Sequence, residues 1–256
     1  MKKIILFSIL AICIVAAGVF TTLIVRELLI DRQSQSFYEN IATEVERRPE
    51  SGITDNTQSE QPDVIDGTDS WVPYVDFNAL NSKFPGVVGW IKLEDTLIDY
   101  PVMQYTDNDY FLSRLPDGTP HRNGSVFLDY RNNRDFSDKS ILIYGHETRA
   151  GDMFGALKNY RDQEYYEVNQ IINLYTPERD YKIILFAGHV AHSIRDHPPL
   201  QFESDEEFLS YIEHLKSISV FNSNTEVTAN DRIVSLVTCT YDFYDARLII
   251  VGILTE

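Results

Sequence analysis

Two residues near the C-terminus, Cys239 and Arg247, have the types and the spacing of a thiol nucleophile and an electrostatic partner. Cys239 ends an apolar run that begins at Ile233, so a buried strand would display the thiol at its exit. Arg247 follows a polar and aromatic turn and opens the next apolar run. Two antiparallel strands joined by that turn would place these side chains beside each other. A guanidinium there favours the thiolate, which is the nucleophilic form, and can bind a developing oxyanion.

His146 is the candidate for proton transfer to and from that thiol. It ends another apolar run, from Ile141 to Gly145, and so would also lie at a strand exit. A cysteine nucleophile needs an imidazole that accepts and supplies protons, and His146 is the best placed of the six histidines. Each residue also has a purely structural interpretation: a lone cysteine is often a small buried apolar residue, and Arg247 could pair with Asp242 or Asp245.

A metal site is a weaker alternative, suggested by His189, His192 and His197. Their spacing, interrupted by Pro198 and Pro199, matches no common zinc pattern, and solvated loop histidines explain it as well. The chain has no paired Cys-x-x-Cys and no glycine-rich phosphate loop of common spacing. We therefore expect neither a metal nor a cofactor.

The elements that would position these residues are predicted to be mainly β. Apolar runs bounded by turn residues predict eight short strands, which suggest a barrel or a sandwich. The strands are predicted at residues 88–93, 97–104, 125–130, 140–144, 170–175, 181–187, 232–240 and 246–254. Peripheral helices are predicted at residues 77–84, 107–115, 152–161 and 205–217.

The N-terminal residues predict a membrane anchor. Ile4 through Val25 contains no charged residue. At about 1.5 Å of rise per residue, this run is long enough for a helix to cross the ~30 Å hydrocarbon core of a bilayer. Lys2 and Lys3 precede it and favour a cytoplasmic N-terminus with the rest of the chain exported. A cleaved signal peptide is the alternative, although its apolar core usually has only about 7–15 residues.

We expect three parts: a cytoplasmic end and transmembrane anchor at 1–26, a helical stalk and flexible acidic linker at 27–70, and an extracytoplasmic catalytic domain at 71–256. The linker, Pro49 to about Ser70, is rich in Asp, Glu, Ser, Thr, Gly and Pro. The formal net charge of −17 argues against nucleic acid as a partner. Cys239 is the only cysteine in the exported part, so it has no intramolecular disulfide partner there.

From about Tyr74 to the C-terminus the chain resembles the class B sortases. Sortases share a Thr-Leu-x-Thr-Cys stretch followed by an arginine, which here is Ser235 through Cys239 followed by Arg247. Ser235 stands where Thr is usual, and Glu147 stands where Asn often follows the histidine. The other motifs similar to class B members are Gly89-Trp90-Ile91, Ile98 through Val102, Asp107-Asn108 with Tyr110 and Leu112, Ser125 through Asp129, and Tyr144-Gly145-His146 with Met153-Phe154.

The resemblance implies an eight-stranded sortase β-barrel and a cysteine transpeptidase. Its substrates would be secreted proteins with a C-terminal sorting signal, often of the Asn-Pro-x-Thr kind. Cys239 would attack the Thr carbonyl, and an amine of a peptidoglycan precursor would resolve the thioacyl enzyme. His146 would protonate the departing amine and deprotonate the incoming one, while Arg247 would bind the oxyanion or the signal backbone.

The resemblance also implies which residues bind the sorting signal. Asn108 and Leu112 would line the signal groove, Thr238 would contribute beside the nucleophile, and residues 190–217 would form the other wall. Three alternatives stay open: a cysteine endopeptidase that uses water, a pilin-polymerising sortase that uses a lysine, and a wall-binding domain without catalysis. The pilin type usually carries an Asp-Pro-aromatic motif in an N-terminal lid, and residues 27–73 contain none.

Overall fold

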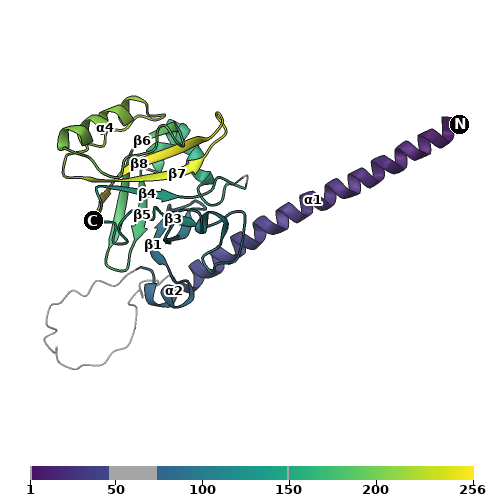
Figure 1. Ribbon diagram of the computed structural model, residues 1–256, viewed down its shortest axis with the longest axis horizontal. Helices are drawn as coiled ribbons and strands as arrows, with labels where there is room; N and C mark the ends of the chain where they lie inside the picture. Colours follow the sequence, from purple (N-terminus) through teal and green to yellow (C-terminus); the bar gives the residue numbers. More distant parts are fainter. Residues whose placement is uncertain (1, 46–73, 149) are drawn as a thin grey trace, which may run out of the picture. The chain divides into compact units, whose positions relative to one another are not determined.

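The computed structural model describes residues 2–45, 74–148 and 150–256 (Figure 1). These residues divide into two compact units, one that ends at Ile41 and one from Ala42 to Glu256. The first unit consists of helix α1 (Lys2–Val45), which continues into the second. From Cys13 to Glu44 this helix is long and apolar enough to cross a membrane. The predicted linker, Pro49 to Ser70, lies outside the described residues.

The second unit is a closed barrel of eight strands in the order β1-β2-β3-β4-β7-β8-β6-β5. The β2–β3 and β4–β7 pairs are parallel, and the remaining pairs are antiparallel. The predicted eight-stranded barrel is confirmed. The strands are β1 (Val87–Lys92), β2 (Asp99–Met103), β3 (Val126–Leu128), β4 (Ser140–Tyr144), β5 (Ile171–Tyr175), β6 (Asp180–His192), β7 (Arg232–Cys239) and β8 (Ala246–Thr255).

Strand β6 is longer than predicted, because β8 pairs with it as far as His192 opposite Ala246. Strand β7 has a nearly continuous apolar sequence, interrupted by Ser235 and Thr238, and both of its faces are covered. Val234 and Leu236 are buried, while Ile233 and Val237 belong to an apolar cluster with helix α4. The nucleophile candidate thus stands at the end of one of the best-buried strands.

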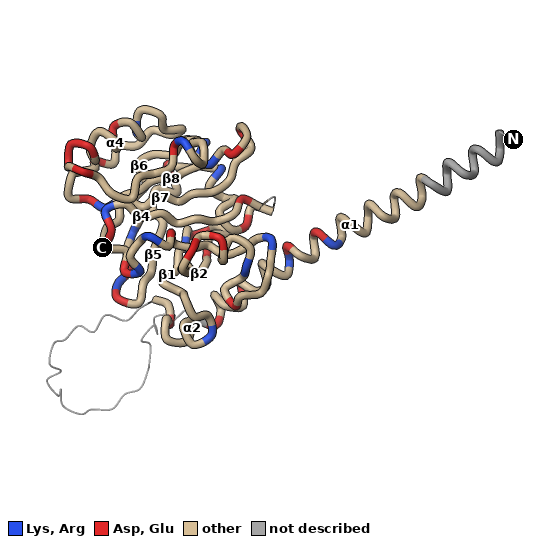
Figure 2. Tube along the Cα trace, in the orientation of Figure 1, with Lys and Arg blue, Asp and Glu red and all other residues tan. Residues whose placement is uncertain are grey.

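Helix α4 (Asp205–Ser217) agrees with its predicted bounds and covers the outer face of β6, β7 and β8 (Figure 1). The Ser204 side chain accepts a hydrogen bond from the Glu207 N–H at its N-terminus. Its first turn is acidic, as the red segments at its start in Figure 2 show, which suits the positive end of the helix dipole. The predicted helix at 77–84 is confirmed as α2 (Phe77–Lys83), and α3 (Gln163–Val168) was not predicted.

The helix predicted at 107–115 is wrong. The structure has only a short 3₁₀ turn there, η1 (Phe111–Ser113), preceded by an irregular loop. The cause is competition for backbone carbonyls: those of Phe111 and Ser113 accept hydrogen bonds from Ser125 and His121 instead of from the next helical turn. The interval predicted at 152–161 is likewise a 3₁₀ helix, η2 (Gly155–Arg161), which starts later than predicted.

We predict that Phe208→Ala lowers the free energy of unfolding by about 3–5 kcal/mol. Phe208 is fully buried in the cluster that joins α4 to the barrel, and the Lys139 ammonium lies 4.1 Å from its ring centroid. Urea unfolding of the full-length protein would measure the change. Leu209→Ala, at a partly buried position beside it, is expected to cost clearly less, and equal losses would contradict this packing.

Candidate active site

All six candidate residues line one cleft of about 260 Å³ at the ends of β4, β7 and β8. The cleft contains the three reactive candidates and the three substrate-binding candidates, and the strand ends and the η1 segment supply its walls. Sequence reasoning therefore placed these residues together correctly, although their roles are a separate matter. The six are Asn108, Leu112, His146, Thr238, Cys239 and Arg247.

Cys239 and Arg247 stand directly opposite each other on β7 and β8. This confirms the predicted strand pairing. One guanidinium nitrogen of Arg247, Nη1, donates to the Ala246 carbonyl over 3.0 Å. Within residues 74–148 and 150–256 no other hydrogen bond of this guanidinium is present, so its remaining N–H groups are available to a ligand.

The turn between Cys239 and Arg247 is braced by a residue that sequence reasoning missed. Arg161, at the end of η2, donates to both carboxylate oxygens of Asp242 over 2.9 and 2.5 Å and to the Thr240 hydroxyl over 3.1 Å. The hydrogen bonds that Asp242 accepts, first those from Arg161 and then one from the Thr240 hydroxyl, lower the pKa of Asp242 to about 2. Asp242 is thus paired with Arg161, and the interpretation of Arg247 as its partner is wrong.

His146 is oriented by the backbone of η1. Its Nε2 lies 2.7 Å from the carbonyl oxygen of Leu112. A carbonyl only accepts, so Nε2 carries a proton in this arrangement, and Nδ1 is the nitrogen left for proton exchange. Among the described residues no hydrogen bond joins His146 to Cys239. Catalytic hydrogen bonds often form only when the substrate is bound, so this geometry is compatible with a proton-transfer role.

Two glycines permit close packing at the two ends of the His146–Leu112 hydrogen bond. At Gly145 a Cβ would lie 2.6 Å from the ring of Phe154, whose backbone N–H donates to the His146 carbonyl over 2.9 Å. At Gly124, with φ +54°, a Cβ would lie 2.5 Å from the Leu112 carbonyl oxygen. Only glycine permits these close approaches, so both positions fix the histidine indirectly.

A buried carboxylate just after β3, that of Asp129, is hydrogen-bonded to Tyr144, which lines the cleft. The side chain of Asp129 is fully buried and accepts hydrogen bonds from Arg131 Nε (2.8 Å), Arg131 Nη2 (2.7 Å) and the Tyr144 hydroxyl (3.0 Å). Burial alone would raise the pKa of Asp129, but hydrogen bonds from Arg131 and Asn108 outweigh it and lower the pKa to about 2. Sequence reasoning used Asp129 only as part of a motif and assigned it no role.

Tyr144 connects Asp129 to the loop before α4. Its hydroxyl lies 3.2 Å from Nε2 of His197, whose Nδ1 lies 2.9 Å from the Pro198 carbonyl oxygen. Burial, followed by the charge of Asp129, raises the pKa of Tyr144, so its hydroxyl stays protonated. The loop that the resemblance assigned to the second wall is therefore tied to the end of β4.

The other histidines of the metal alternative do not assemble a site. His189 is buried in β6, where burial lowers its pKa to about 4, and His192 ends the same strand. Over the part of the chain that the structure describes, no group of three or more His, Cys, Asp or Glu side chains is placed to hold a metal ion.

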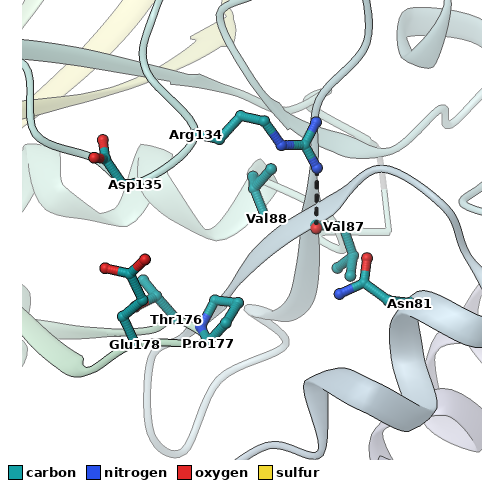
Figure 3. Close-up of a pocket in the computed structure, with 8 residues that line it drawn as sticks. All are labelled: Asn81, Val87, Val88, Arg134, Asp135, Thr176, Pro177 and Glu178. Carbon is teal, nitrogen blue, oxygen red and sulfur yellow. Dashed lines mark hydrogen bonds between the residues drawn. The ribbon is translucent and has the colours of Figure 1, made fainter.

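A separate cavity of about 240 Å³ is lined by the β1 start and the β5–β6 turn (Figure 3). There the Arg134 guanidinium donates to the Val87 carbonyl over 3.5 Å, and the carboxylates of Asp135 and Glu178 line the same cavity. None of the six candidate residues lines it, so we assign it no part in the chemistry.

Comparison with known proteins agrees with this geometry. A family model of the sortase domain matches residues 91–255. Sortase B of Listeria monocytogenes serovar 1/2a is 35% identical over 168 residues, covering 65% of this chain and 68% of that protein. A Staphylococcus aureus sortase B–substrate complex is similar with a TM-score of 0.67 and 30% identity, over 70% of this chain and 84% of that one. Sortase B from Bacillus anthracis gives a TM-score of 0.70 and 30% identity, over 88% and 96%.

We predict that Gly145→Ala destabilises the fold by about 1–3 kcal/mol, because the added methyl group collides with the buried ring of Phe154. Denaturant unfolding would measure the loss. The double variant Gly145→Ala with Phe154→Leu makes room for the methyl group and is expected to recover part of it. A double variant no better than the sum of the two single changes would show that the collision is not the cause.

We also predict that Asp129 stabilises the fold in a pH-dependent way. Its pKa is about 2 in the folded chain against an ordinary value of 3.8, so its contribution is complete above pH 4 and is lost as the pH falls toward 2. The difference in unfolding free energy between the wild type and Asp129→Asn should therefore shrink by about 2 kcal/mol over that window. A difference that stays constant between pH 5 and 2 would contradict the ionised, hydrogen-bonded carboxylate.

Proposed function

This chain belongs to the sortase family, and on that premise we propose that it is a membrane-anchored cysteine transpeptidase that joins secreted proteins to the cell wall. Its substrates would carry a C-terminal sorting signal of the Asn-Pro-x-Thr kind, and the acceptor would be an amine of peptidoglycan. The observation that carries the proposal is the direct pairing of Cys239 with Arg247 in the cleft that also contains His146.

In the first half of the reaction the sorting signal is cleaved. The Cys239 thiolate attacks the carbonyl carbon of the signal threonine, and the free N–H groups of Arg247 bind the oxygen that becomes negative. The peptide C–N bond then breaks and leaves a thioester on Cys239. His146 supplies the proton that the departing amine needs.

In the second half an amine replaces the sulfur. The acceptor nitrogen attacks the thioester carbonyl, His146 removes its proton, and the C–S bond breaks to restore the Cys239 thiolate. The product is a new amide bond. Another solved sortase B is complexed with triglycine, a peptide with a free amino end, which supports an amine as the acceptor here.

The sorting signal would lie along the cleft between η1 and the ends of β4 and β7. The exposed side chain of Leu112 offers an apolar contact, and Asn108 offers an amide. The Thr238 hydroxyl is buried beside Cys239 and has no hydrogen-bond partner among the described residues, so it would serve the signal only after a local rearrangement. The similar Staphylococcus aureus structure is a sortase B–substrate complex, which supports a substrate-binding role for this fold.

Membrane anchoring would come from helix α1. Its apolar segment is long enough to span a bilayer, and Lys2 and Lys3 at its start favour a cytoplasmic N-terminus. The barrel would then lie outside the cell, where the sorting signals of exported proteins and the wall amines both occur. The domain boundaries proposed from the sequence, 1–26, 27–70 and 71–256, describe this arrangement.

The acceptor separates this proposal from a cysteine endopeptidase. Incubating the full-length protein in detergent with labelled Asn-Pro-x-Thr peptides and a panel of amines should give an amide product whose yield follows the amine concentration. Peptide hydrolysis that ignores every amine would instead identify an endopeptidase. Selective use of a lysine side chain would identify a pilin-polymerising enzyme.

We predict that Cys239→Ala and His146→Ala each abolish turnover. Arg247→Lys keeps the charge but loses the forked donor geometry, so kcat/KM should fall by about 100-fold. Intact-mass analysis would also show an acyl adduct that maps to Cys239 in the wild type and is missing in Cys239→Ala. The matched control is Cys13→Ala, which removes the other cysteine. Near-normal activity of any of the three variants would overturn its assigned role.

A further inference from the structure

Asn108 is held at both ends of its side-chain amide. It lies in the loop between β2 and η1, and its Nδ2 donates to Oδ2 of Asp129 over 3.0 Å. Its Oδ1 accepts from the backbone N–H of Tyr130, also over 3.0 Å. Both partners belong to the segment just after β3. A residue that lines the cleft is therefore oriented by two groups of a segment that does not itself line the cleft.

Only one orientation of this amide is compatible with those partners. An ionised carboxylate only accepts hydrogen bonds, and a backbone N–H only donates. If the amide were turned over, its oxygen would face the Asp129 carboxylate and its NH₂ group would face the Tyr130 N–H. Both contacts would be repulsive. The Asp129 carboxylate is kept ionised by two hydrogen bonds from Arg131, and a low pKa of about 2 agrees with this.

The hydrogen bonds that Asn108 already makes determine which of its polar groups remains available to a ligand. An amide has two N–H donors and one oxygen acceptor. The oxygen has its partner in Tyr130, while one N–H is used by Asp129 and the other has no partner among the residues that the structure describes. Asn108 is partly exposed at the cleft, so this second N–H can donate to a bound ligand, while its oxygen is already used. The group that Asn108 offers to a ligand is therefore a donor, which requires an acceptor.

We propose that Asp129 is a positioning residue, which fixes the Asn108 amide so that its second N–H donates to a carbonyl oxygen of the bound sorting signal. The inference rests on the proposed function and deepens it, because it assigns the polarity of one contact in the signal groove. Asp129 does not touch the signal; its side chain is fully buried and acts through Asn108.

A purely structural role for Asp129 predicts a different outcome from this positioning role. If it only held the loop through Arg131 and Tyr144, its loss would disturb the whole cleft and lower kcat together with the alkylation rate of Cys239. If it acts through Asn108, its loss weakens signal binding and leaves the reaction of Cys239 unchanged. A double-mutant cycle separates the two, since residues that act through one another are not additive.

The test measures kcat and KM of full-length wild type, Asp129→Asn, Asn108→Ala and the double variant with an Asn-Pro-x-Thr peptide and a fixed amine. An asparagine at position 129 offers a donor as well as an acceptor, so only the Tyr130 N–H still selects the orientation of Asn108, and the amide is held less firmly. We expect Asp129→Asn to raise KM about 10-fold and to change kcat by less than about 2-fold. A rise of this size corresponds to the loss of one hydrogen bond between Asn108 and the signal. In the Asn108→Ala background the same change should have no further effect.

Asp138→Asn is the matched control. Asp138 accepts hydrogen bonds from the side chains of Asn132 and Asn133 in the same connection between β3 and β4, but none from Asn108. It should lower stability without changing KM.

The rate at which iodoacetamide alkylates Cys239, and the pH profile of that rate, should be the same in wild type and Asp129→Asn.

Three results would overturn the inference. One is an unchanged KM in a folded Asp129→Asn variant. Another is an additive effect of the two substitutions. The last is a parallel fall of kcat and of the alkylation rate, which would indicate a structural role. If the wild type turned over no signal peptide at all, the proposed function would fail first and this inference with it, whereas a wild type that turns over peptides isolates the failure to Asp129.

Discussion

The register between β7 and β8 is the constraint from which the chemistry follows, because it sets Cys239 opposite Arg247 at the end of the two strands. A shift by one residue would turn the whole apolar set of β7 from one face to the other. That shift is opposed on both sides: Val234 and Leu236 are buried on one face, and Ile233 and Val237 pack with α4 on the other. The packing that stabilises the barrel therefore also aligns the thiol with the guanidinium.

Much of this architecture could be predicted because its signals are local. The strands are short apolar runs between turn residues, and α4 has apolar side chains at helical spacing after the capping residue Ser204. The closeness of Cys239 and Arg247 follows from a single hairpin. The resemblance to sortases supplied the roles of the six candidate residues, which the cleft brings together and which experiments have to test.

The remainder depended on partners that are distant in the sequence. A helix was predicted at 107–115, but the backbone N–H groups of His121 and Ser125 donate to carbonyl groups of this segment. The sequence of the segment itself does not indicate these two donors. Arg161 braces the turn at Asp242 from the end of η2. Asp129 collects Arg131, Asn108 and Tyr144 around one carboxylate, and only the folded chain shows that such a group is buried.

The parallel pairing of β4 with β7 has a consequence for how this fold can change. Because the two strands run the same way, with Tyr144 beside Val237, His146 and Cys239 emerge at the same end of the barrel. Parallel neighbours need a long crossover, and here it includes β5, β6, α4 and the loop tied to Tyr144. Insertions in that crossover would reshape the rim of the cleft while the ladder keeps the reacting atoms in register. The segment that shapes the rim of the cleft and the strands that align the reacting residues are therefore separate parts of the chain, and one can change without the other.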